Sequence, residues 1–312
     1  MKIQRAVISG ATGAVGMALI QECIQREMEV LVLCREGSCH RKRIPEHPLL
    51  HVIYCNMEKM AELKDGWDGS YDIFYHLAWG GTTGADRNDM YLQNRNVKYT
   101  LDAVHLAARM GCHTFIGAGS QAEYGRVNEK LSGKTSVKPE TGYGMAKLCA
   151  GQMSREEAGR LGMRHIWARI LSVYGPYDGE GSMISSLIHT LLKGEIPSLT
   201  PGEQKWDYLY SKDAARAMLL LGEGGIHGKV YCIGSGAARP LKEYMYLLRD
   251  AIDPSLKLGI GKKPYGDRQV MYLCADISEL TKDTGFQPEV SFETGIRETI
   301  RWIIQEKKSS SC

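Results

Sequence analysis

The sequence lacks the features that several protein classes require. Its formal net charge is only +3, so we expect no strongly basic surface for nucleic acid. Its nine cysteines include no C-x-x-C pair, which fits neither a disulfide framework nor a zinc pattern and indicates a reducing, cytoplasmic compartment. No apolar run is long enough to span a bilayer, and the first residues resemble no signal peptide, so we expect no membrane partner.

The composition instead suits a globular protein with an ample core. Of its 312 residues, 43% are hydrophobic and 24% are charged, which allows one large or two moderate domains. No internal repeat or low-complexity linker divides the chain. The last residues, 307–312, are expected to form a flexible tail.

Short apolar strands alternate with helices in the first half of the chain. We expect a helix over about 89–110 and strands at 3–8, 30–33, 51–54, 72–78 and 113–118. Continuous apolar strands joined by helices predict a parallel sheet that is covered on both faces. The fold class is therefore α/β, with a doubly wound parallel sheet of the Rossmann type and ligands beyond the carboxyl ends of the strands.

A glycine-rich turn, Gly10–Gly16, stands between the first strand and an amphipathic helix. Glycines at this spacing allow a tight turn, a close backbone approach to a pyrophosphate and close packing of helix on strand. The turn and the neighbouring strand ends predict a dinucleotide site that includes Gly10, Thr12, Gly13, Ala14, Val15, Gly16, Asn56, Met57, Ala78 and Trp79.

Tyr143 and Lys147 are four positions apart, which places both side chains on one face of a helix. A free phenol has a pKa near ~10, and a neighbouring ammonium lowers it. A tyrosine held in this way can exchange a proton with an oxygen that changes between alcohol and ketone. Ser120 follows the fifth strand, where its hydroxyl could orient a substrate carbonyl.

Motifs along nearly the whole chain resemble the extended short-chain dehydrogenase/reductase family, which acts on nucleotide sugars. They are the three spaced glycines, Phe74–Ala78, Asn96-Val97, Ser120–Gly125, Tyr143-x-x-x-Lys147, Arg169–Pro176, Asp207–Asp213 and Thr284–Pro288. The resemblance implies that Tyr143 is the acid/base, that Lys147 lowers its pKa and holds the nicotinamide ribose, and that Ser120 binds the substrate oxygen. It adds Leu77 and Asn96 to the cofactor contacts and implies no metal.

The end of the second strand departs from the family pattern. Members that use NAD usually have an acidic residue there for the ribose 2′-hydroxyl, whereas this chain has Cys34 followed by Arg35. An arginine can pair with a 2′-phosphate, so we expect NADP(H) to be favoured through Arg35 and NAD(H) to remain possible. The basic run that follows, 40–43, is expected to be a solvated loop.

A second departure follows the catalytic hydroxyl. The dehydratases of the family have an acidic pair, or at least a glutamate, directly after it, whereas here Gln121 and Ala122 stand in those positions. Glu123 is one residue late, and such a shift generally points a side chain elsewhere. We therefore expect no dehydration, and we expect Gln121 to contact the substrate.

In the second half, we expect helices at 183–192, 212–221, 241–252, 277–283 and 292–305 and strands at 196–199 and 230–233. The predicted dinucleotide domain is 1–173 plus 206–233. A smaller substrate lobe is formed by insertions, 174–205 plus 234–306. A cleft between lobes is a usual ligand site.

Several residues are candidates for substrate binding. Ser172 stands where relatives usually have an asparagine, and Trp206 stands where many epimerases have an arginine. A nucleotide diphosphate needs cations, for which Lys205, Lys263 and Arg268 are candidates by position. Tyr174 could stack on a base or sugar, although ordinary core packing explains it equally well.

Three functions remain open at this stage. The first is NADPH-dependent reduction of a nucleotide-linked 4-keto-6-deoxyhexose, and the second is a nucleotide-sugar 4-epimerase with tightly held NAD. The third is a dinucleotide-sensing protein without catalysis, against which the retained Tyr143 and Lys147 argue. The helices that carry Leu101 and Met145 form a dimer in many relatives, so we expect a homodimer.

Overall fold

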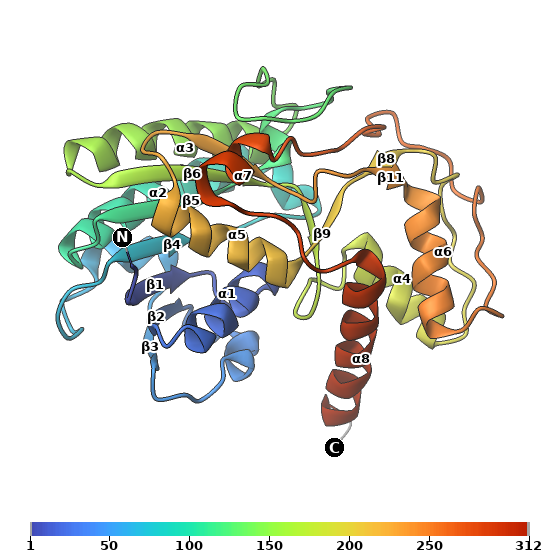
Figure 1. The fold of residues 1–312 in the computed structure, drawn as a ribbon, viewed down its shortest axis with the longest axis horizontal. Coiled ribbons are helices and arrows are strands. Elements are labelled where there is room, and N and C mark those ends of the chain that lie inside the picture. The colour runs from blue at the N-terminus through green and yellow to red at the C-terminus, as the bar shows by residue number, and fades with distance from the viewer. Residues whose placement is uncertain (1, 311–312) are drawn as a thin grey trace.

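The computed structural model describes residues 2–310. A seven-stranded parallel sheet, with strand order β10-β6-β5-β4-β1-β2-β3, forms the larger of two lobes (Figure 1). The strands are β1 (Arg5–Ser9), β2 (Glu29–Cys34), β3 (Leu50–Tyr54), β4 (Ile73–His76), β5 (Thr114–Ser120), β6 (Arg164–Ile170) and β10 (Val230–Ile233). This arrangement confirms the predicted doubly wound fold.

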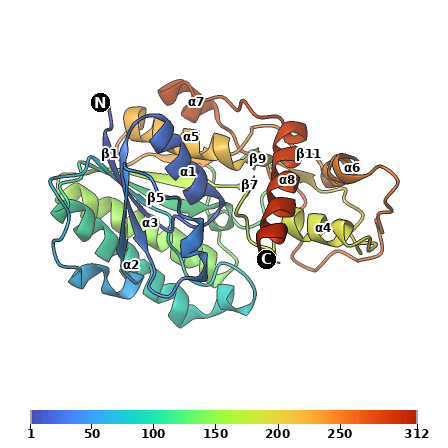
Figure 2. The ribbon, with the colours of Figure 1, turned by 90° about the horizontal axis from the view of Figure 1, so that it is seen from below.

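Helices cover both faces of this sheet (Figure 2). The first pair, α1 (Ala14–Gln25) and α5 (Ser211–Gly224), packs on one face, and the second pair, α2 (Met90–Arg109) and α3 (Gly142–Arg160), packs on the other. Both helices of the second pair have an N-cap residue, Asp89 for α2 and Thr141 for α3. Their side chains accept hydrogen bonds from backbone N–H groups of the first helical turn. The start of α3 is therefore fixed two residues before Tyr143.

The strand order reverses between β1 and β4, and this opens a crevice at their carboxyl ends. Four short 3₁₀ helices border this edge: η1 (Cys39–Arg43), η2 (Met57–Glu62), η3 (Ala85–Asn88) and η4 (Gln121–Glu123). Gly10 has a φ of +75°, and a Cβ there would lie 2.4 Å from the backbone nitrogen of Ala78. Only glycine allows the turn after β1 to lie this close to the end of β4.

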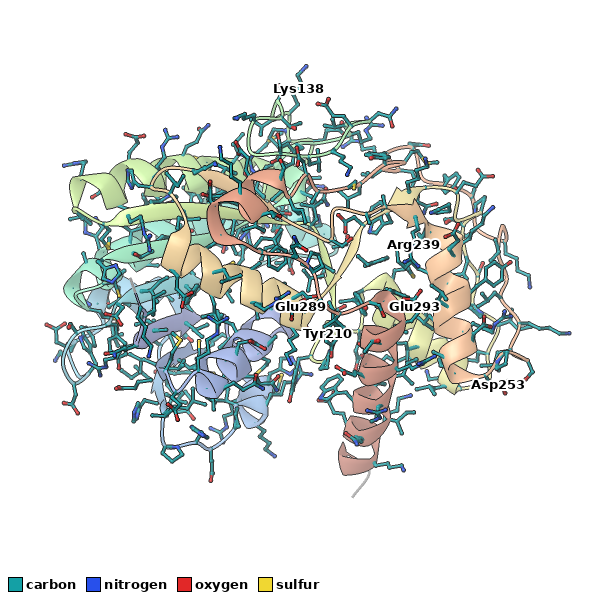
Figure 3. All side chains as sticks on the ribbon, in the orientation of Figure 1. Lys138, Tyr210, Arg239, Asp253, Glu289 and Glu293 are labelled. Atoms are coloured by element: carbon teal, nitrogen blue, oxygen red, sulfur yellow. The ribbon has the colours of Figure 1, made fainter. Side chains whose placement is uncertain are left out.

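The smaller lobe contains α4 (Met183–Leu192), α6 (Leu241–Ile252) and α8 (Phe292–Ser310). Two small sheets join it to the larger lobe, β7 (Ser172–Tyr174) with β9 (Tyr208–Tyr210) and β8 (Lys205–Trp206) with β11 (Arg239–Pro240). Arg239 and Glu293 form an ion pair of 3.1 Å between β11 and α8 (Figure 3).

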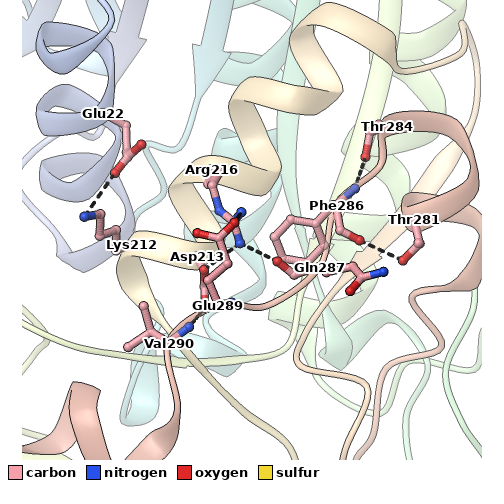
Figure 4. A network of polar contacts seen from close by, with 10 residues as sticks. All are labelled: Glu22, Lys212, Asp213, Arg216, Thr281, Thr284, Phe286, Gln287, Glu289 and Val290. Carbon is pink, nitrogen blue, oxygen red and sulfur yellow. Dashed lines mark hydrogen bonds and ion pairs between the residues drawn. The ribbon is translucent and has the colours of Figure 1, made fainter.

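A buried carboxylate ties the two lobes together (Figure 4). Asp213, in the first turn of α5, accepts hydrogen bonds from the backbone N–H groups of Glu289 and Val290 at 3.0 and 2.9 Å. Arg216, one turn further along α5, pairs with Asp213 and also donates to the carbonyl of Gln287. These contacts hold the chain that enters α8 against the larger lobe.

The structure corrects three predicted boundaries. The predicted strand at 196–199 is only an isolated bridge between Ser198 and Gly259. The helix α7 (Ser278–Thr284) packs on α5, and Leu280 and Phe286 join the core of the larger lobe, so the predicted lobe 234–306 is too long. The helix α8 continues through Ser310, so 307–310 are helical rather than a tail, and 311–312 lie outside the described residues.

Within residues 2–310, no helix is long and apolar enough to cross a membrane. The eight cysteines of that part of the chain form no disulfide, and no group of three potential metal ligands occurs there.

Candidate active site

The three predicted catalytic residues belong to neighbouring elements. Ser120 is the last residue of β5, and Tyr143 and Lys147 lie in the first two turns of α3. Helix α3 packs on β5 and on η4, so the phenol and the ammonium lie at the carboxyl edge of the sheet. The Ser120 hydroxyl lies close enough to the Tyr143 phenol to lower its pKa.

Lys147 is only 3% exposed. Its Nζ donates a 2.6 Å hydrogen bond to the carbonyl oxygen of Ala118 and lies 3.7 Å from the centre of the Trp79 ring. Burial lowers the pKa of Lys147 to about 7, while the nearby Glu123 carboxylate raises it. Its charge is therefore easily changed near neutral pH.

Tyr143 lies between several groups that tune its phenol. The pKa of Tyr143 is raised above its usual value, because burial outweighs the lowering effects of Ser120 and of the Arg87 guanidinium. The guanidinium carbon of Arg87 is 4.3 Å from the centre of the Tyr143 ring, and Arg87 donates to the carbonyl of Thr82 at 2.7 Å. The phenol thus has two cations within reach, Arg87 and Lys147, whose Nζ is 5.8 Å from the ring centre.

Glu123 does not face the catalytic hydroxyl as an acid. Its Oε1 accepts hydrogen bonds from the Ser120 backbone N–H at 2.8 Å and from the Trp167 indole at 3.0 Å, and its Oε2 pairs with Arg169 at 2.6 Å. The carboxylate is fully buried. It caps the η4 turn and holds Ser120 in place.

A cavity of about 560 Å³ opens beside this triad at the β1/β4 crevice. Predicted cofactor residues that line it are Gly10, Thr12, Arg35, Asn56, Met57, Ala78, Trp79 and Asn96. Gly13 borders open space, where a Cβ would meet no atom within 4 Å, and a Cβ at Gly16 would lie 2.6 Å from the Cα of Ala11. The cavity fits a dinucleotide, whose pyrophosphate would lie at the start of α1.

Ala14, Val15, Leu77, Tyr143 and Lys147 do not line this cavity. Ala14 and Val15 begin α1, and Leu77 follows β4, whose turn contacts Gly10. Tyr143 and Lys147 lie behind Trp79, which lines the cavity and contacts both side chains.

The part of the cavity near the end of β2 is lined by the Arg35 guanidinium, and the Glu58 carboxylate also lines the cavity. Arg35 and His40 line it together with Cys34 and Ser38, and Glu36 is not among the lining residues. The Glu36 backbone N–H is held by the side chain of Asn56 at 3.2 Å.

The basic run 40–43 is not simply a solvated loop. It forms η1, and Arg43 pairs with Glu306 of α8 at 3.5 Å and donates to the carbonyl of Thr12 at 3.4 Å. The Arg43 guanidinium also lies 5.6 Å from the ring centre of Tyr177. It therefore joins the glycine turn to the smaller lobe.

A second cavity, also about 560 Å³, lies within the smaller lobe. Trp206, Tyr208, Leu187 and Met245 supply apolar walls, and Lys263 is its only charged lining residue among those described. The indole of Trp206 donates to the Ser172 hydroxyl at 2.7 Å, and Ser172 lies two residues beyond Ile170, the register partner of Ser120. This pair connects the second cavity with the catalytic edge.

The other predicted substrate residues lie in different places in the structure. Tyr174 is 1% exposed, and its hydroxyl donates to the carbonyl of Phe292, so it is a core residue. Lys205 is exposed and Arg268 is exposed, and neither lines a described cavity. Gln121 is half-buried in η4, next to Ser120.

Arg87 and the buried partners of Glu123 were not predicted from the sequence. Arg87 lies in the segment between β4 and α2, at the carboxyl edge where ligands bind, and that position was the available signal. Trp167 and Arg169 are two positions apart in β6, so their side chains lie on the same face of the sheet.

The fold and the site are those of a dinucleotide-dependent enzyme of the extended short-chain dehydrogenase/reductase type. The chain belongs to the NAD dependent epimerase/dehydratase family, whose model matches residues 6–234. The resemblance inferred from the sequence is thereby confirmed.

Two relatives illustrate the range of the family. The chain is 24% identical to a UDP-N-acetyl-alpha-D-glucosaminuronate decarboxylase of Bacillus cytotoxicus, over 96% of this chain and 98% of that protein. It is 27% identical to a dTDP-glucose 4,6-dehydratase of Escherichia coli, over 56% of this chain and 51% of the dehydratase.

Solved structures with the same fold include two enzymes of different activity. A UDP-N-acetylglucosamine 4-epimerase from Methanobrevibacter ruminantium, in complex with UDP-N-acetylmuramic acid, superposes with a TM-score of 0.87, at 22% identity over 98% of this chain and all of that one. A dTDP-glucose 4,6-dehydratase from Streptomyces venezuelae with bound NAD gives 0.83, at 21% identity over 98% of each chain.

Proposed function

We propose that this protein is an oxidoreductase that uses NADPH to reduce a nucleotide-linked 4-keto-6-deoxyhexose. The observation that carries the proposal is the cluster of Ser120, Tyr143 and Lys147 beside a cavity that Arg35 borders. The dinucleotide would supply a hydride to the sugar carbonyl carbon. Ser120 would orient the carbonyl oxygen, and Tyr143 would give it a proton while Lys147 holds positive charge nearby.

The surroundings of Ser120 support reduction over elimination. The only carboxylate in η4 is that of Glu123, and it is committed to Ser120, Trp167 and Arg169. Removal of water from a hexose needs a further acid/base. We therefore expect no product lighter by one water when a nucleotide-hexose that still carries its 6-hydroxyl is supplied, as measured by mass spectrometry.

A 4-epimerase with retained NAD is the second candidate. It is supported by the use of the same triad in both directions and by the bound NAD in a UDP-glucuronic acid 4-epimerase from Bacillus cereus, which superposes with a TM-score of 0.83. Lys263 in the second cavity would meet the nucleotide phosphates in either reaction.

One experiment separates the two candidates. The cofactor released from purified protein is identified, and NADPH consumption is followed with nucleotide-linked 4-keto-6-deoxyhexoses. We expect an empty site and NADPH oxidation that matches alcohol formed. Stoichiometric retained NAD with interconversion of 4-epimers, and no net oxidation of NADPH, would replace the proposal by the epimerase.

We further propose that the protein is a homodimer through α2 and α3. Their outer faces carry exposed apolar side chains, among them Tyr91, Met145 and Met153. Light scattering of the purified protein tests this.

A further inference from the structure

Trp79 occupies the centre of the catalytic cluster. Its ring centre is 3.7 Å from the Lys147 Nζ and 6.1 Å from the centre of the Tyr143 ring, with an angle of 83° between the two ring planes. The indole therefore presents its face to the ammonium and packs in an edge-to-face arrangement with the phenol. The electron-rich face of an indole attracts a cation, and this attraction strengthens where water is excluded.

The surrounding structure fixes the orientation of this indole. Its Nε1 donates to the Gln93 side-chain oxygen at 2.9 Å, and Gln93 is 1% exposed. The Gln93 amide nitrogen in turn donates to the carbonyls of Gly81 and Asp86 at 2.8 and 2.9 Å. The ring is thus anchored from α2 through a buried amide rather than held by packing alone.

We propose that Trp79 is a positioning residue for the catalytic pair, whose indole face holds the Lys147 ammonium in its charged form beside Tyr143. Lys147 has one backbone acceptor, the Ala118 carbonyl, so the aromatic face supplies a second favourable contact for the charge. The inference rests on the roles proposed for Tyr143 and Lys147, and it adds a residue that acts through them.

Other charged or titratable groups also face this ammonium. Glu123 of η4 raises the pKa of Lys147, and Arg87 of η3 lies over the Tyr143 ring. His76, at the end of β4, is neutral, because burial first and the Lys147 charge second lower its pKa to about 3. All of these groups stay unchanged in the variants below, so differences between variants report on residue 79.

The test measures the protonation of Lys147 directly, without substrate. Protein labelled with [ε-¹³C]lysine is titrated by NMR, and Lys147→Arg assigns the resonance. Residue 79 is replaced by tryptophans with increasing fluorine content, inserted at an amber codon, because fluorine weakens the cation–π attraction with little change of shape. We expect the midpoint of Lys147 to fall stepwise by roughly half to one pH unit over the series.

Two ordinary variants complete the design. Trp79→Phe keeps an aromatic face and should titrate close to wild type, whereas Trp79→Leu fills similar space without one and should titrate lower. A constant midpoint across the fluorinated series, or a higher midpoint in Trp79→Leu than in Trp79→Phe, would overturn the proposal. The fluorinated series decides the question even if Trp79→Leu does not fold.

The result of the NMR titration does not depend on which reaction the enzyme catalyses. A flat titration series counts against Trp79 whether or not the enzyme reduces a sugar, and a missing reductase activity leaves the NMR result intact. If the reductase assay succeeds, the alkaline limb of kcat/KM should move to lower pH across the same series, a shift that a purely structural role would not produce.

Discussion

Trp206 donates a hydrogen bond to Ser172 over 2.7 Å, and at both positions the sequence is expected to depart from the usual pattern of its relatives. The two departures are therefore one structural unit. The Trp206 indole lines the second cavity, where the resemblance implies an arginine in many epimerases, and the Ser172 hydroxyl is the acceptor that orients it.

The first prediction is that the two residues are energetically coupled. Ser172→Ala removes the acceptor and should raise KM for the nucleotide sugar by roughly 2- to 10-fold with little change in kcat, the range of one hydrogen bond. Trp206→Phe should have a similar effect, and the double variant should be little worse than either one. Steady-state kinetics of the four proteins form the test, and fully additive effects would contradict it.

The second prediction concerns the proton donor. Tyr143→Phe should fold and bind cofactor normally but lose about 10²- to 10⁴-fold in turnover, because the phenol oxygen carries the transferred proton. Tyr246→Phe, at an exposed site on α6, is the matched control and should behave as wild type. Near-normal turnover of a folded Tyr143→Phe protein would remove the triad assignment.

The third prediction concerns cofactor choice. Arg35 lines the predicted cofactor cavity next to the end of β2, so Arg35→Ala should weaken NADPH binding by roughly tenfold or more and leave NADH binding almost unchanged. Arg41→Ala, in the basic run 40–43, is the control, since Arg41 does not line the cavity. Calorimetric titration of both cofactors decides it, and equal weakening of both would show that Arg35 is not the selector.

The fourth prediction concerns stability. Glu123→Gln leaves the buried Arg169 guanidinium without its anion and should lower the free energy of unfolding by about 3–5 kcal/mol. The control is Glu140→Gln, which breaks the exposed pair with Arg126 and should cost less than about 1 kcal/mol. Urea unfolding at neutral pH compares the two, and similar losses would contradict the structural role of Glu123.

The fifth prediction concerns acid stability. Burial lowers the pKa of His76 to about 3, so the folded protein keeps this imidazole neutral where the unfolded chain binds a proton. The contribution of His76 to the free energy of unfolding is fully present at a pH above about 6.5, the pKa of the unfolded chain. This contribution is lost as the pH falls toward 3. The drop in unfolding free energy from pH 7 to pH 5 should shrink by about 2 kcal/mol in His76→Gln. An unchanged drop in urea titrations at the two pH values would argue against it.

The fold and the grouping of Ser120, Tyr143 and Lys147 at one edge of the sheet could be predicted because their signals are local. The glycine turn, the alternation of strands with helices and the Tyr143–Lys147 spacing each lie within a few residues. The anchoring contacts are not local: Glu123 meets Arg169 across 46 positions, and Tyr174 donates to Phe292 across 118. No periodicity in the sequence encodes such partners.

The absence of Lys205 from the lining of the second cavity has a simple geometric cause. Lys205 and Trp206 are consecutive in β8, and neighbouring side chains of a strand point to opposite faces. Since Trp206 lines the second cavity, Lys205 is directed away from it. Position in the chain alone could not decide which of the two enters the cavity.

The tie between Asp213 and the backbone at Glu289 and Val290 bears on how such enzymes can exchange specificity in evolution. The smaller lobe consists of separate stretches of the chain. The segment that enters its last helix, α8, is hydrogen-bonded to the Asp213 carboxylate of the larger lobe. Both donors are backbone N–H groups, which every residue except proline offers, so these two hydrogen bonds depend on the carboxylate at 213 and not on which side chains stand at 289 and 290. Side chains of the smaller lobe, those of the cavity wall at 172 and 206 included, can therefore change without loss of the attachment of α8.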